Sequence, residues 1–174
     1  SELEKLMKDV KEVIDEIRKK LRKILEDTTR VAKRNEEKLK RIADEAEKVI
    51  REIRDEIEKK GPRDEVERRL RRLETELRRL LDESRKENER LRREHEKLSK
   101  ELRDLLDDLR RRVEEANVDE EIKKRIDDLL RRIEKEIEEI NRRVEELHKR
   151  LEDLHKEIED KVRELLTRIE ERLK

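Results

Sequence analysis

The chain has no cysteine and no aromatic residue, and only one glycine and one proline among its 174 residues. The lack of cysteine excludes disulfide bonds, thiolate nucleophiles and thiolate zinc sites. The lack of aromatic side chains removes the platform on which single-stranded nucleic acids stack. Basic and acidic residues each number 53, so the formal net charge is zero and the basic stripe that binds phosphates is missing. We therefore predict no nucleic-acid partner.

Long apolar stretches are absent as well. No apolar run approaches the roughly 18 residues that a membrane-spanning helix needs, and the N-terminus lacks the apolar core of a signal peptide. We expect a water-soluble protein that has no membrane partner and no targeting signal. The sequence does not indicate a cellular compartment.

Charged residues make up 61% of the chain and hydrophobic residues 30%, a balance that on its own would favour disorder. The apolar residues are periodic, however. They recur at intervals of three and four residues and average about 3.6, close to the period of a straight helix. This pattern predicts an all-α protein. We expect a long antiparallel three-helix bundle that is coiled-coil-like and weakly supercoiled.

Two short segments interrupt the periodic pattern. At the first, Gly61 suits the left-handed position that ends a helix, Pro62 cannot continue that helix, and Asp64 can cap the next one. At the second, Asn117 suits the left-handed position and Asp119 the N-cap. Ser1 gives the first helix a similar start. The breaks predict helices over about 2–60, 64–116 and 119–174.

We expect these helices to form a single domain over residues 1–174. Connections of a few residues force consecutive helices to run antiparallel. The apolar face of each helix is narrow, which suits three helices that close on one another without a required partner. The first helix has the widest apolar face, so a designed helical partner or a second copy of the chain would contact the protein there.

Residues 80–99 carry polar side chains at positions that should point into the core. Residues equally distant from a turn face one another across a hairpin, so the turns place polar residues of the other helices opposite them. A buried polar group without a partner costs about 1–3 kcal/mol, so we expect these residues to bond to one another. We predict three polar layers: Thr28, Thr29 and Asn141 around His95; Asn35 and Asn88 around His148; and Ser84 beside His155. Ser99 lies beside the inward line of the second helix and is also expected to be buried.

Histidines in a core can bind metal or catalyse proton transfer, or they can be structural. His148 and His155 lie about 10.5 Å apart along a helix, too far to share a zinc ion. No HExxH motif occurs. We predict no catalytic residue, no metal site and no cofactor, and hence no enzyme. Neutral histidines in hydrogen-bond networks would fix helix register, and their pKa values would be lowered by burial. Such a protein would lose stability in acid.

The Glu/Lys/Arg surface, the Leu/Ile/Val core, the short loops and the polar layers together resemble computationally designed helical bundles with buried hydrogen-bond networks. The resemblance covers the whole chain and implies a protein without catalytic residues that is made by recombinant expression. Natural three-helix repeats such as spectrin have shorter helices and aromatic cores. Two interpretations follow. One is a monomeric scaffold with no natural biochemical activity, and the other is an interaction module that accepts a helix or self-associates and responds to pH.

Overall fold

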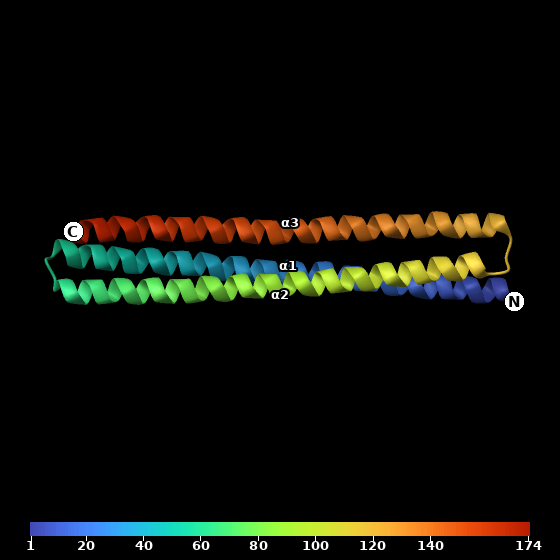
Figure 1. Cartoon of the computed structure of the whole chain (residues 1–174), viewed down its shortest axis with the longest axis horizontal. Coiled ribbons are helices and arrows are strands. Elements are labelled where there is room, and N and C mark those ends of the chain that lie inside the picture. The colour runs from blue at the N-terminus through green and yellow to red at the C-terminus, as the bar shows by residue number, and fades with distance from the viewer. The chain divides into compact units, whose positions relative to one another are not determined.

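The computed structural model describes residues 1–174 and contains three helices and no strand. Helix α1 spans Glu2–Glu58, α2 spans Arg63–Glu115 and α3 spans Glu120–Leu173 (Figure 1). None of the helices has an internal glycine or proline, so nothing interrupts their backbone hydrogen bonds. The predicted all-α three-helix fold is confirmed, and the predicted helix bounds lie close to the observed ones.

The chain divides into two compact units. Unit 1 consists of Ser1–Arg30 and Leu91–Leu147, and unit 2 of Val31–Arg90 and His148–Lys174. Each helix contributes one segment to each unit. Within a unit, the α2 segment runs antiparallel to the α1 and α3 segments, as short connections require (Figure 1). That residues 1–174 form a single domain stays a prediction.

Each unit has its own apolar core. In unit 1, Ile17 of α1, Leu109 of α2 and Ile133 of α3 are almost fully buried within one cluster. In unit 2, Ile53 of α1 and Ile169 of α3 belong to a second cluster, to which α2 contributes a row of leucines. Burying one such side chain stabilises the fold by about 1.5–3 kcal/mol. Because the cluster members recur every three or four residues, each helix presents one apolar stripe to its unit.

The turn between α1 and α2 differs from the prediction. The left-handed residue is Lys60, with φ of 55°, and Gly61 does not have a positive φ. The Lys60 N–H donates to the Ile57 carbonyl and the Gly61 N–H to the Glu56 carbonyl, at 3.1 and 2.9 Å. This pair of bonds is a Schellman motif. Proline disfavours helical conformations in the residue before it, so Pro62 moves the left-handed position back by one residue.

The start of α2 is also shifted. Its first turn opens on the Pro62 carbonyl, which accepts from the Glu65 and Val66 N–H groups at 3.1 Å. Asp64 therefore lies inside the first turn, where its charge favours the helix dipole, and the prediction that it is the N-cap is wrong.

The other two caps follow the prediction more closely. The Asp119 carboxylate accepts from the Glu121 N–H at 3.4 Å, and the Ser1 hydroxyl accepts from the Glu4 N–H at 3.3 Å. Both N-caps are confirmed. Asn117 is not left-handed, so that prediction is wrong. The end of α2 is capped instead by Lys123, whose Nζ donates to the Glu114 carbonyl at 2.8 Å.

The left-handed Lys60 yields a prediction about stability. Lys60→Gly should raise the free energy of unfolding by about 0.5–1 kcal/mol, because glycine adopts this conformation without strain from a Cβ atom. Gly61→Ala should lower it, since a Cβ there would lie 3.2 Å from the Glu56 carbonyl oxygen. Urea unfolding measures both effects. Lys59→Gly is the matched control and should be destabilising, and a stabilisation equal to that of Lys60→Gly would contradict the explanation.

Candidate functional site: polar side chains in the cores

Polar side chains in both units pair with α2. In unit 1, Thr28 of α1 bonds to His95 and Asn141 of α3 bonds to Ser99, each at 2.8 Å. In unit 2, His148 and His155 of α3 reach α2 at 2.9 and 2.8 Å. The predicted polar stretch of α2 therefore supplies partners to both neighbouring helices.

The contact between Thr28 and His95 fixes the ring proton of His95. Thr28 is fully buried, and its hydroxyl donates its single proton to the Ile24 carbonyl at 2.6 Å. The hydroxyl oxygen must then accept from His95, so Nε2 carries a proton. Burial lowers the pKa of the half-buried His95 below its usual value of 6.5, against smaller opposing effects of the Glu94 and Asp27 charges. His95 is therefore held in its neutral form.

Asn141 and Ser99 bond to each other rather than to His95. The Asn141 amide donates to the Ser99 hydroxyl at 2.8 Å, and both residues are partly buried. Neither side chain is fully buried, although both were predicted to be. The prediction of one layer around a histidine becomes two neighbouring pairs.

His148 and Asn88 form the most enclosed polar pair. Both are buried, and His148 is 1% exposed. The Asn88 oxygen can only accept, so it receives the Nδ1 proton of His148 at 2.9 Å. Asn35 of α1, the third predicted member of this layer, is 2% exposed, but neither of its amide atoms has a hydrogen-bond partner. An amide left in this state costs about 1–3 kcal/mol.

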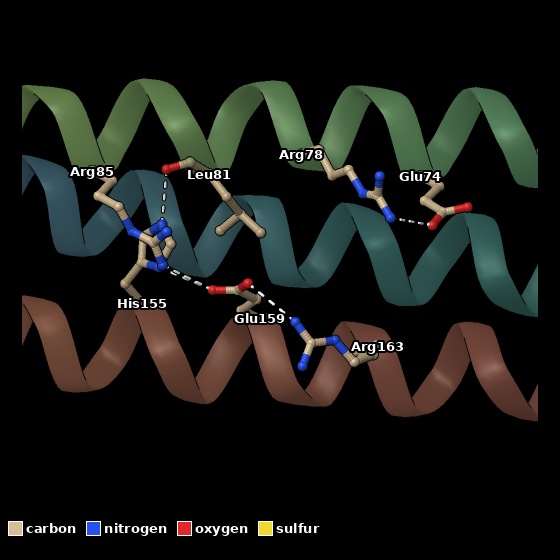
Figure 2. A network of polar contacts seen from close by, with 7 residues as sticks. All are labelled: Glu74, Arg78, Leu81, Arg85, His155, Glu159 and Arg163. Carbon is tan, nitrogen blue, oxygen red and sulfur yellow. Dashed lines mark hydrogen bonds and ion pairs between the residues drawn. The ribbon is translucent and has the colours of Figure 1, made fainter.

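His155 bonds to the backbone rather than to the predicted Ser84. Its Nε2 donates to the Leu81 carbonyl at 2.8 Å, so Nδ1 is the acceptor of the neutral ring (Figure 2). Nδ1 faces Arg85 Nη2 at 3.5 Å and Glu159 Oε2 at 3.7 Å. Arg85 and Glu159 are themselves paired at 3.0 Å. Ser84 is partly buried and lines the same cavity as His155.

Thr29 does not belong to the buried set, which corrects the prediction. It is exposed, and its hydroxyl donates to the Leu25 carbonyl of its own helix at 2.7 Å. Successive helical residues point about 100° apart, so only one of two adjacent threonines can face the core, and Thr28 does.

Sequence reasoning missed three partners of His155: the Leu81 carbonyl, Arg85 and Glu159. A backbone acceptor leaves no trace in a side-chain pattern. The spacing of four residues between His155 and Glu159 was a usable signal, because such residues are neighbours on a helix surface.

Nowhere in the chain do three or more His, Cys, Asp or Glu side chains form a group that could hold a metal ion. None of the helices has an apolar stretch long enough to cross a membrane.

No family model matches the chain, and no curated protein sequence matches it. A solved structure described as a computationally designed three helix bundle is 23% identical. The match covers 98% of this chain and 88% of the other, with a TM-score of 0.40.

The lowered pKa of His95 predicts acid sensitivity. A histidine that is neutral in the folded state contributes its full stability above the unfolded pKa of about 6.5 and loses it as the pH falls below that value. We expect the His95 ring signal in NMR spectra to titrate below 6.5. The free energy of unfolding should fall from pH 7.5 to 5.5. The matched control is His95→Gln, which keeps a donor for Thr28 but does not titrate. An equal loss in this variant, or a His95 pKa at or above 6.5, would contradict the explanation.

The pair formed by Asn88 and His148 predicts energetic coupling. Asn88→Leu and His148→Leu should each lower the free energy of unfolding by about 1–3 kcal/mol, because each leaves a buried partner unpaired. The double variant should lose less than the two together, with a coupling of about 0.5–3 kcal/mol. Thr29→Ala serves as an exposed control and should stay within about 0.5 kcal/mol of the parent. Strictly additive effects in urea unfolding would refute the coupling.

Proposed function

We propose that the protein is a designed structural scaffold without natural biochemical activity, whose polar core positions select one arrangement of its helices. The supporting observation is that, in unit 1, α2 bonds to α1 through His95 and to α3 through Ser99. Sliding α2 along α1 would separate His95 from Thr28, and sliding it along α3 would separate Ser99 from Asn141, which leaves polar groups in the core unsatisfied. Arrangements other than the observed one are thereby disfavoured.

The same contacts support a protein that is not an enzyme and needs no cofactor. Each histidine donates a ring N–H to a partner of its own unit, and this bond fixes the orientation of the ring. His148 and His155 lie in separate contacts. The hydroxyl that His95 contacts, on Thr28, is fully buried and donates its own proton to the Ile24 carbonyl, so His95 does not accept that proton as a general base would. We therefore assign the histidines a structural role.

An interaction module is the second candidate. Leu3 and Met7 of α1 are 37% and 45% exposed, and no other large hydrophobic residue is exposed to this extent. Both lie on the helix whose apolar face was predicted to be the widest. A partner helix or a second copy of the chain could cover them.

Light scattering across about a hundredfold range of concentration separates the two candidates, because only an associating protein changes its mass with concentration. Refractive-index detection is required, since the chain has no Trp or Tyr. The scaffold predicts a constant mass of 21.6 kDa. A larger species that Leu3→Glu and Met7→Glu convert to the monomer would favour the interaction module.

The proposed role of the polar pairs has its own test. We expect a variant with leucine at Asn88, His95, Asn141 and His148, valine at Thr28 and alanine at Ser99 to stay helical and to unfold at an equal or higher urea concentration, because apolar groups then replace both members of each polar pair. It should lose its single arrangement and give extra or broadened NMR signals. One set of sharp signals, as in the parent, would show that the pairs do not select the topology.

A further inference from the structure

Two cavities lie along the seam between α2 and α3 of unit 2. The larger has a volume of about 520 Å³ and the smaller about 300 Å³, and residues of these two helices form most of their walls. His155, Arg85 and Glu159 line both cavities and therefore stand between them (Figure 2). Exposed side chains of both helices form the rim, so the cavities are reached from solvent. A water molecule occupies only about 30 Å³, so each cavity can hold an amino-acid side chain.

Apolar side chains form the floor of each cavity. Leu81 and Leu166 lie under the smaller cavity and Leu151 under the larger, and 7%, 8% and 6% of their surfaces stay exposed. The larger cavity also contains Ser84, a small and partly buried residue that follows Leu77 and Leu81 on the inward face of α2. An apolar side chain from outside would cover leucine surface that the protein itself leaves uncovered.

The two cavities are spaced like side chains on one face of a helix. Helix α2 contributes residues 74–85 to the smaller cavity and 84–89 to the larger. The centres of these two segments are therefore about seven residues apart, or ~10.5 Å at 1.5 Å per residue. Residues i and i+7 of a helix lie two turns apart on the same face, and amphipathic helices use such pairs as anchors in a groove.

The rim of the two cavities is acidic, because seven acidic and only four basic residues line them. The three arginines among these are already paired, Arg78 with Glu74, and both Arg85 and Arg163 with Glu159 (Figure 2). Four exposed carboxylates take no part in these pairs, namely those of Asp82, Glu89, Asp160 and Glu170. Such a rim favours a partner that carries lysine or arginine beside its apolar stripe.

We propose that the seam between α2 and α3 of unit 2 is a docking surface for an amphipathic α-helix with basic flanks. Two apolar side chains of the partner, seven residues apart, enter the two cavities. Basic side chains beside them pair with Asp82 and Glu89, which are also seven residues apart. The surface rests on the interaction-module candidate and gives it a partner, at a place distinct from Leu3 and Met7 of α1.

An alanine-based helical peptide of about 18 residues tests the surface. It carries leucines seven residues apart, lysines beside them and one terminal tryptophan. The protein has no Trp, so the peptide fluorescence reports binding without background. We expect saturable binding that weakens as salt is added, and backbone amide shifts in ¹⁵N–¹H spectra within residues 74–89 and 151–170. A peptide with glutamate in place of lysine, or alanine in place of leucine, should bind about tenfold less tightly or worse. No saturable binding, or equal binding of the glutamate peptide, overturns the proposal.

Matched variants separate the docking surface from general attraction between charges. Ser84→Leu fills the larger cavity and should weaken binding about tenfold. Asp82→Asn with Glu89→Gln removes two rim charges and should weaken binding about threefold to tenfold. Glu101→Gln with Asp104→Asn removes the same charge from exposed positions of α2 in unit 1 and should bind as the parent does. Thermal unfolding confirms that each variant is folded.

Two outcomes refute the surface: unchanged affinity in the folded Ser84→Leu variant, or equal loss in the two charge variants. Amide shifts centred on Leu3 and Met7 would also refute it, yet would support an interaction module that binds through α1. Failure of the docking surface is thus distinguished from failure of the candidate function on which it rests.

Discussion

The structure depends on one constraint, which is that a polar group taken into a helix core needs a partner. Breaking a buried pair costs more than the net stability the pair provides, so polar core positions discriminate between arrangements more than they stabilise any one of them. Leucine, isoleucine and valine stripes would tolerate a shift of one helix along another, since one apolar contact resembles the next. The pair formed by Asn88 and His148 tolerates no such shift, because its two atoms meet at 2.9 Å at one register only.

Much of the fold and part of the site could be predicted from the sequence. The helices follow from the apolar period, and the core positions of Asn88 and His148 follow from the distance of each residue from a turn. What could not be predicted depends on the backbone. Lys60 is left-handed because Pro62 constrains the residue between them, and His155 bonds to the Leu81 carbonyl, which a side-chain pattern does not represent. Patterns of residue types locate polar positions but do not choose among nearby acceptors.

Asn35 marks the limit of reasoning from matching polar residues. Its helix position was predicted well, since its side chain is buried as expected, yet its amide has no partner. Asn88 uses its oxygen for His148, and the cavity beside Asn35 leaves no neighbouring protein group at bonding distance. Two polar residues must lie opposite each other on neighbouring helices to form a hydrogen bond, but that position alone does not ensure the bond.

The histidine contacts separate topological specificity from pH response. In all three contacts the histidine acts through a ring N–H: His95 to Thr28, His148 to Asn88 and His155 to Leu81. Protonation of His95 adds a proton to Nδ1, so its bond to Thr28 survives in the imidazolium form. Acid therefore acts through the cost of placing a charge in a buried site, as at His95, and not through breaking the pairs that set register. His95 can then weaken unit 1 at low pH while the helices of that unit keep their alignment until they separate.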